Sequence, residues 1–156
     1  MKITEDILKE IYLFSRFDDK ELSLLAAKVG NITLDVQGLL FSAGAPATSM
    51  YVIKHGTLKV TSSSGEGNDV KLTTVAAGQH LGELPFLDGE RRSANAEAME
   101  KTELLELKYQ DLREIFSASK DMELKFFREI GRFLVKRLRV LTADVTQARE
   151  FKKRYT

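Results

Sequence analysis

The chain has 156 residues, 43% of them hydrophobic, which suits one domain with a genuine core. Its 24 basic and 23 acidic residues nearly balance, so the overall charge predicts no attraction to nucleic acid or to an acidic membrane. The absence of cysteine excludes disulfides, thiolate metal ligands and cysteine nucleophiles, and it fits a reducing compartment. The first residues lack a signal-peptide pattern, and no apolar run approaches the roughly 20 residues that span a bilayer. We therefore expect one cytoplasmic domain over residues 1–156, with no membrane association.

The N-terminal residues 1–30 are predicted to be helical. Apolar side chains recur at steps of three and four between Ile7 and Val29, and Phe17-Asp18-Asp19 interrupts this pattern. We therefore expect two short helices with a break at these three residues.

Residues 31–108 are predicted to form strands. Short apolar runs alternate there with glycines, a pattern typical of a β-sandwich or β-barrel. The stretch from Ser62 to Asp69, SSSGEGND, has the composition of a flexible hairpin loop, and its G-E-G is too weak a pattern to indicate nucleotide binding.

Residues 109–156 return to a helical period. It covers Tyr109 to Phe116 and then a long run from about Ser119 to Lys153, where Ser119 or Asp121 is expected to cap the helix. Strands enclosed by helices at both ends predict an α+β fold.

The long helix carries an apolar stripe spaced as in a two-stranded coiled coil. Its residues follow one another at steps of four, three, four and three: Leu134, Leu138, Leu141, Val145 and Ala148. This spacing favours a homodimer formed through the C-terminal helix, because it stays regular beyond the length that one small domain would cover. The alternative is that the stripe packs against the strands of its own chain.

The segment GQHLGELPFLDGERRSANA, residues 78–96, combines residue types that suit a small phosphate ligand. Pro85 fits the first turn of a short helix, whose free N–H groups favour an anion. The guanidinium fork of Arg92 suits phosphate oxygens, and the small Ser93 leaves room for a ligand. Glu83 would repel phosphate, so it fits the site only if it accepts a hydrogen bond from a hydroxyl such as a ribose 2′-OH. Taken singly, Glu83 or Arg92 is better explained as a solvated charge or as part of a structural ion pair.

Together these residues resemble the phosphate-binding cassette of the cyclic-nucleotide-binding domain family. The family pattern is a G-E-L tripeptide, a short helix and an R-[STA]-A tripeptide, and this chain has Gly82-Glu83-Leu84 and Arg92-Ser93-Ala94 at the matching spacing. The preceding GAPATSMYVIKHGTLKV resembles the family's glycine-strand-glycine stretch. Similarity to the sensory domain of the bacterial cyclic AMP receptor protein extends over about residues 10 to 145.

The resemblance implies that residues 31–108 form an antiparallel β-roll, a jelly-roll-like double-stranded β-helix, with the cassette at 82–94. Helices at 1–30 and 109–156 flank the roll, and the last helix is long.

The resemblance also implies how the cassette holds its ligand. Arg92 would neutralise the cyclic phosphate, and Ser93 and the backbone around Ala94 would add donors to it. Glu83 and the backbone of Gly82 would hold the ribose 2′-OH.

Residues outside the cassette are implied in the same way. Leu72 and Thr73 fall on a strand that lines the base pocket in the family, Arg137 is expected to pair with Glu83, and Thr142 is expected to approach the purine. The implied ligand is cyclic AMP or cyclic GMP, with no cofactor and no metal. The expected ligand-binding residues are Gly82, Glu83, Leu84, Arg92, Ser93, Ala94, Leu72, Thr73, Arg137 and Thr142.

Departures from the family pattern leave the preferred base open. Arg91 stands where many members have proline, and Leu141 stands where the bacterial receptor has a base-contacting threonine. Ser93 supplies a hydroxyl of the kind that members responsive to cyclic GMP also carry, usually as threonine. Some members have lost ligand binding, so a ligand-silent scaffold is an alternative, although the acid and the arginine of the cassette are both present here.

The predicted function is a non-enzymatic regulatory or sensor domain that signals to an effector protein through its C-terminal helix. The alternative is the sensory part of a transcription regulator without its DNA-binding domain. Because the sequence ends at Thr156, we expect no specific DNA binding by this chain alone. A metal enzyme of the cupin type would need clustered imidazole and carboxylate ligands, whereas the only histidines are His55 and His80, and we expect His80 to be a surface turn residue.

Overall fold

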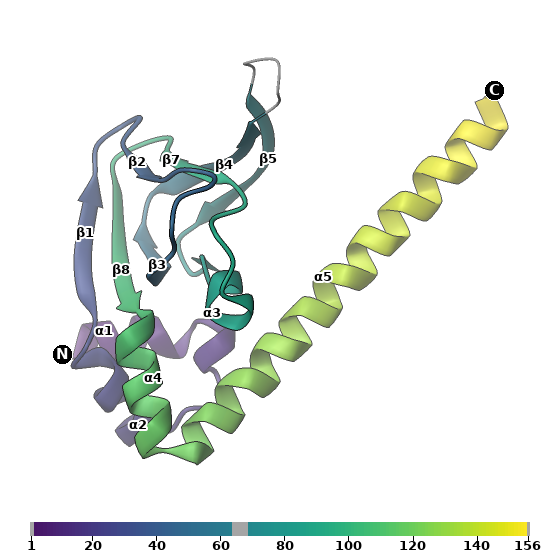
Figure 1. Cartoon of the computed structure of the whole chain (residues 1–156). Coiled ribbons are helices and arrows are strands. Elements are labelled where there is room, and N and C mark those ends of the chain that lie inside the picture. Colours follow the sequence, from purple (N-terminus) through teal and green to yellow (C-terminus); the bar gives the residue numbers. More distant parts are fainter. Residues whose placement is uncertain (1, 64–68, 156) are drawn as a thin grey trace.

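The fold is a roll of two four-stranded antiparallel sheets with helices at one end (Figure 1). The computed structural model describes residues 2–63 and 69–155. The sheet orders are β1-β8-β3-β6 and β2-β7-β4-β5. The strands are β1 (Gly30–Leu34), β2 (Leu39–Phe41), β3 (Ser49–His55), β4 (Thr57–Ser63), β5 (Asp69–Ala76), β6 (His80–Leu81), β7 (Asn95–Ala98) and β8 (Thr102–Lys108). The predicted α+β fold with an antiparallel β-roll is confirmed.

The core between the two sheets follows from strand alternation, since successive side chains of a strand point to opposite faces. Tyr51 and Ile53 of β3 face inward together with Leu104 of β8. Small side chains on β7, Ala96 and Ala98, are fully or almost fully buried and allow the second sheet to approach closely.

The opposite face of β3 and β8 carries a second core, which the helices cover. Met50, Val52, Leu105 and Leu107 pack there against helical side chains such as Phe126. The helices are α1 (Lys2–Lys9), the 3₁₀ turn η1 (Tyr12–Phe14), α2 (Asp19–Ala26), α3 (Leu84–Asp88), α4 (Tyr109–Ala118) and α5 (Lys120–Tyr155). Both faces of β3 are therefore buried, which fixes its position in the molecule.

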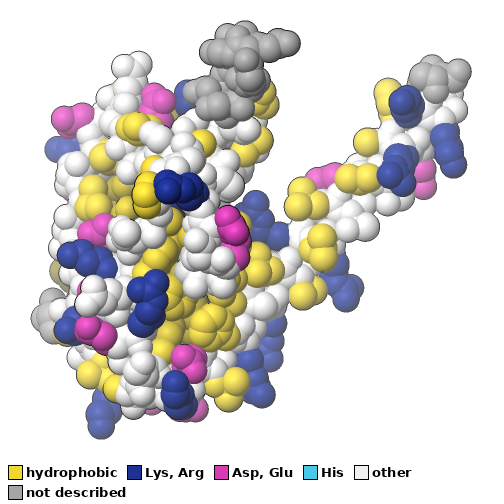
Figure 2. All heavy atoms as spheres, viewed as in Figure 1, with side chains coloured by type: hydrophobic (Ala, Val, Ile, Leu, Met, Phe, Trp, Pro, Cys, Tyr) yellow, Lys and Arg dark blue, Asp and Glu magenta, His cyan; other side chains and the backbone are white. Residues whose placement is uncertain are grey.

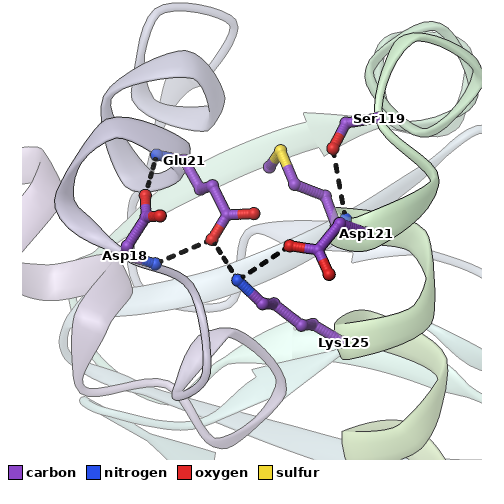
Figure 3. Close-up of polar contacts among 6 residues, drawn as sticks. Asp18, Glu21, Ser119, Asp121 and Lys125 are labelled. Carbon is purple, nitrogen blue, oxygen red and sulfur yellow. Dashed lines mark hydrogen bonds and ion pairs between the residues drawn. The ribbon is translucent and has the colours of Figure 1, made fainter.

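The predicted break near Phe17 is confirmed, because a capping box begins α2 at Asp18. The Asp18 carboxylate accepts from the Glu21 N–H at 2.8 Å, and Glu21 accepts from the Asp18 N–H at 2.9 Å (Figure 3). Lys125 of α5 then joins the two helical regions, with its Nζ 2.7 Å from Glu21 and 3.1 Å from Asp121. Ser119 caps α5, as expected, by accepting from the backbone N–H of Met122 at 3.2 Å.

The hairpin between β4 and β5 lies where the sequence predicted one. The two strands pair as far as Ser63 and Asp69, so they extend into the predicted loop at both ends. Residues 64–68 of that loop lie outside the described residues.

Helix α5 has 36 residues, and its second half leads away from the roll (Figure 1). Hydrophobic side chains are spaced along this exposed part among basic ones (Figure 2). Leu138, Leu141 and Val145 of the apolar stripe are 64%, 57% and 52% exposed, so the stripe is not packed into the strands of its own chain. The homodimer stays a prediction. None of the described helices combines the length and the apolar character that a bilayer-spanning segment requires.

Candidate functional site

A cavity of about 420 Å³ lies between β4 and β5, the segment around α3, and α5. Nine of the ten expected site residues line it: Leu72, Thr73, Gly82, Glu83, Leu84, Arg92, Ser93, Ala94 and Arg137. The tenth, Thr142, does not line it, and its hydroxyl donates to the backbone carbonyl of Leu138 at 2.8 Å. Leu141, its neighbour on α5, lines the cavity instead.

Arg92 is the main cation of the cavity and is only 5% exposed. Its Nη2 donates to the Ser49 carbonyl at 2.6 Å, and its Nη1 donates to the Gly82 carbonyl at 3.4 Å. The guanidinium lies 4.2 Å from the ring centroid of Phe41 and 5.7 Å from that of Tyr51. Two aromatic faces and two carbonyls therefore fix the fork in one orientation.

The Nε of Arg92 is a buried donor with no hydrogen-bond partner in the described part of the chain. An unsatisfied buried polar group costs about 1–3 kcal/mol, and more when the group is charged. An anionic acceptor that reached this atom would relieve the cost. The unpaired donor therefore fits a site built for an anion.

The backbone of the cassette is held by the β2–β3 connection and by one glycine. The Arg92 N–H donates to Ala45 O, and the Arg92 carbonyl accepts from the Gly44 N–H. Gly82 has φ +84°, and a Cβ there would lie 2.7 Å from Nη1 of Arg92. Glycine at position 82 therefore allows the guanidinium to approach the chain.

The structure does not form the expected ion pair between Glu83 and Arg137, although Arg137 attracts the Glu83 carboxylate; the hydrogen bond of Glu83 is to His80. Glu83 Oε2 lies 3.1 Å from Nδ1 of His80, whereas the guanidinium of Arg137 lies 5.8 Å from the ring of Phe133. Burial alone would raise the pKa of the Glu83 carboxyl. The hydrogen bond and electrostatic attraction from His80, with smaller contributions from the Glu83 N–H and Arg137, outweigh burial and lower that pKa below its ordinary value. Glu83 is therefore ionised at neutral pH and able to accept.

The expectation for His80 is also wrong. It lies on β6 rather than in a surface turn, and its side chain is only 4% exposed. The ring packs against Phe133 of α5 with centroids 4.6 Å apart. The spacing of three between His80 and Glu83 was a sequence signal for their hydrogen bond. No sequence signal placed Phe133 beside them.

Tyr109, the first residue of α4, was also missed from the sequence. Its hydroxyl donates to the carbonyl of Gly82, so it supports the glycine that accommodates Arg92. Burial raises the pKa of Tyr109 to about 12, although the nearby Arg92 opposes the rise. Tyr109 therefore stays protonated and remains a donor at physiological pH.

The cavity has both polar and apolar lining. Arg92, Ser93 and Glu83 supply polar groups, whereas Val60, Leu72 and Leu141 supply apolar surface. Such a cavity suits a small molecule with an anionic, hydroxylated part and a flat, less polar part. Within the described residues, no group of three or more histidine and acidic side chains is placed to hold a metal ion.

Comparison with known proteins finds relatives of this chain. The cAMP-activated global transcriptional regulator CRP of Haemophilus influenzae is 31% identical over 104 residues, which cover 66% of this chain and 46% of the regulator. The chain therefore spans less than half the length of that relative.

Solved structures show the same fold. The N-terminal domain of a transcriptional regulator from Streptomyces coelicolor A3(2) is 29% identical, with a TM-score of 0.77 over 84% of this chain and 94% of that one. The regulatory domain of Toxoplasma gondii PKA, solved with cAMP, is 23% identical, with a TM-score of 0.69 over 73% of this chain and 43% of that one. The sequence profile of the cyclic nucleotide-binding domain matches residues 35–119, more than half of the chain. The chain therefore belongs to the cyclic nucleotide-binding domain family.

Proposed function

We propose that this chain is a regulatory domain that binds cyclic AMP in the 420 Å³ cavity and transmits the binding through α5. The observation that carries the proposal is the buried Arg92, which lines the same cavity as Glu83 and whose Nε has no hydrogen-bond partner among the described residues. We choose cyclic AMP rather than cyclic GMP as the proposed ligand because the Haemophilus relative is cAMP-activated.

The polar parts of the ligand would contact the polar residues of the cavity, and its base would contact the apolar residues. The cyclic phosphate would lie at Arg92, with Ser93 and the backbone around Ala94 as further donors. The ribose 2′-OH would donate to Glu83, and the base would lie on the apolar surface near Leu72.

Transmission would follow from the position of α5. Arg137 and Leu141 of this helix line the cavity, so a ligand that contacts them binds some positions of α5 better than others. A tenfold preference corresponds to about 1.4 kcal/mol, and a hydrogen bond to a charged group contributes about 1.5–3 kcal/mol. A few ligand contacts are therefore enough to shift the helix.

The exposed apolar stripe of α5 would hold a second copy of the chain, in the manner of a two-stranded coiled coil. We expect a homodimer in analytical ultracentrifugation and a monomer for Leu138→Glu. The dimer would act on an effector protein in the cytoplasm, without catalysis. A wild-type chain that sediments as a monomer at high micromolar concentration would contradict the dimer.

The test of the site is calorimetric titration of wild type, Arg92→Ala and Arg91→Ala with cyclic AMP and with cyclic GMP. Arg91 is the matched control, because its guanidinium is exposed and bonds only to the Gly44 carbonyl, at 3.0 Å, among the described residues. Loss of one charge-assisted contact predicts roughly a tenfold to hundredfold weaker affinity for Arg92→Ala and little change for Arg91→Ala. Circular dichroism verifies that both variants fold.

Equal affinity in wild type and Arg92→Ala would refute the assignment of the phosphate site. A folded wild-type protein that binds neither nucleotide would show that the chain is a ligand-silent scaffold of the family. Tighter binding of cyclic GMP would overturn only the choice of base.

A further inference from the structure

His80 connects the acidic residue of the cavity to the long helix. Its Nδ1 lies 3.1 Å from Oε2 of Glu83, and its ring lies 4.6 Å from that of Phe133 on α5. Its side chain is 4% exposed, so both contacts are shielded from water. A buried histidine that touches the proposed ribose acceptor on one side and the proposed output helix on the other is placed to link them.

We propose that His80 is a positioning residue, which aims the Glu83 carboxylate at the ligand hydroxyl and couples that carboxylate to α5 through the ring of Phe133. This inference rests on the proposed function and adds to it the path from the ribose to the helix.

The first part follows from the hydrogen-bonding capacity of the two groups. An ionised carboxylate only accepts, so Nδ1 of His80 carries the proton that it donates to Glu83. One bond from His80 occupies one oxygen, and the carboxylate keeps about three further lone-pair positions for a ligand hydroxyl. The bond also compensates part of the cost of burying the charge, since Glu83 is only 6% exposed. Without it, a buried carboxylate would gain a proton more easily and would lose its fixed orientation.

The second part follows from the packing on the far side of the ring. Phe133 contacts Tyr12 of η1, with centroids 5.8 Å apart, and lies under the guanidinium of Arg137 at 5.8 Å. His80, Phe133 and Arg137 also line a neighbouring cavity of about 280 Å³, which adjoins the site through shared residues such as Thr73. The rings therefore have free volume into which they can move when a ligand pulls on Glu83, and Phe133 transmits that movement to α5.

Two substitutions separate the donor of His80 from its ring. His80→Asn keeps an N–H donor close to the position of Nδ1 and lacks the ring, whereas His80→Phe keeps a ring and lacks the donor. Affinity is measured by calorimetry for cyclic AMP and for 2′-deoxy cyclic AMP, which has no hydroxyl for Glu83 to accept from. His80→Leu, which also lacks a donor, replaces His80→Phe if circular dichroism shows that the latter does not fold.

For His80→Phe we expect the affinity for cyclic AMP to fall by roughly tenfold or more, which corresponds to the loss of one hydrogen bond to a charged group. Its affinity for the 2′-deoxy analogue should stay close to that of wild type, because the lost interaction acts only on the hydroxyl. His80→Asn should restore most of the affinity for cyclic AMP. A residue with only a structural role would weaken the two ligands equally.

Coupling is measured by hydrogen exchange of the α5 amides with and without saturating cyclic AMP. We expect the ligand-dependent change in α5 to be reduced in His80→Asn, which bonds to Glu83 but lacks the ring, and also in His80→Phe, which has a ring but no bond to Glu83. The same 156-residue chain serves for both measurements.

The outcomes separate the two proposals. A folded wild-type chain that binds neither nucleotide would overturn the proposed function and this inference with it. Normal binding by wild type, with no loss or with an equal loss of both ligands in His80→Phe, would overturn the inference alone. An unchanged exchange response of α5 in His80→Asn would overturn the coupling through Phe133.

Discussion

Replacing Gly82 with alanine is expected to disable the site without removing any side chain that lines it. Gly82 has φ +84°, and the new Cβ would lie 2.7 Å from Nη1 of Arg92 and 3.3 Å from the Ser49 carbonyl. Arg92 is buried and already held by that carbonyl at 2.6 Å, so its guanidinium must leave its position. The left-handed conformation alone costs a non-glycine residue about 1–2 kcal/mol. A lost hydrogen bond to the charged fork adds about 1.5–3 kcal/mol.

Gly78→Ala is the matched control, because its φ of +86° is almost the same and nothing lies within 4 Å of its Cβ. Both variants are compared with wild type by urea denaturation and by titration with cyclic AMP. We expect Gly82→Ala to be less stable than Gly78→Ala by about 1.5–3 kcal/mol and to bind roughly tenfold more weakly or worse. Equal stability and equal affinity in the two variants would refute the idea that Gly82 is required for the position of Arg92.

Three further substitutions test the support of the site and of the helices. Phe41→Leu removes the ring 4.2 Å from the cassette arginine and is expected to weaken cyclic AMP binding by roughly threefold to thirtyfold in calorimetry, and unchanged affinity would count against the cation–π contact. Lys125→Met, which breaks the bridge between α2 and α5, is expected to lower the free energy of unfolding by about 0.5–1.5 kcal/mol, whereas Lys120→Met, at a 75% exposed side chain, should change it little. Tyr109→Phe removes a hydroxyl whose pKa is raised from 10.0 to about 12 in the folded state. A raised pKa contributes stability below pH 10 and loses it as pH rises toward 12, so the stability advantage of wild type over Tyr109→Phe should shrink between pH 10 and 12 in urea titrations, and a constant advantage would contradict the shift.

Much of the fold was predictable because its signals are local. The short apolar runs of the strands, the glycines between them and the return of the helical period after residue 108 all describe a residue's own neighbourhood in the chain. The break at Phe17 has an equally local cause, since the two halves of the capping box, Asp18 and Glu21, are three residues apart.

The cavity was predictable to the extent that one continuous segment builds it. Six of the expected residues lie between positions 82 and 94, so their spacing carried the information. The residues that join the site from afar were harder to place. Tyr109 approaches Gly82 through the tertiary fold alone, and no sequence pattern marks that contact.

The errors on α5 and β6 have specific physical reasons. Successive residues of a helix differ by about 100° in direction, so an assignment that is off by one position replaces Leu141, which lines the cavity, with Thr142, which does not. Arg137 was expected to pair with Glu83, but the hydrogen bond of the Glu83 carboxylate is to His80, which lies on the adjoining strand. That competition depends on the burial of His80 behind Phe133, which is a property of the folded molecule.

Because α5 is long, a small tilt of the helix at the cavity produces a larger displacement of its C-terminal end. Between residues 133 and 155 the helix rises roughly 33 Å, at about 1.5 Å per residue, so a tilt of about 10° at Phe133 would displace its far end by roughly 6 Å. Phe133 of α5 contacts His80, while the second half of the helix leads away from the roll (Figure 1). A rearrangement no larger than a side-chain adjustment would therefore suffice to reposition whatever the distal helix holds, with the two sheets left as they are.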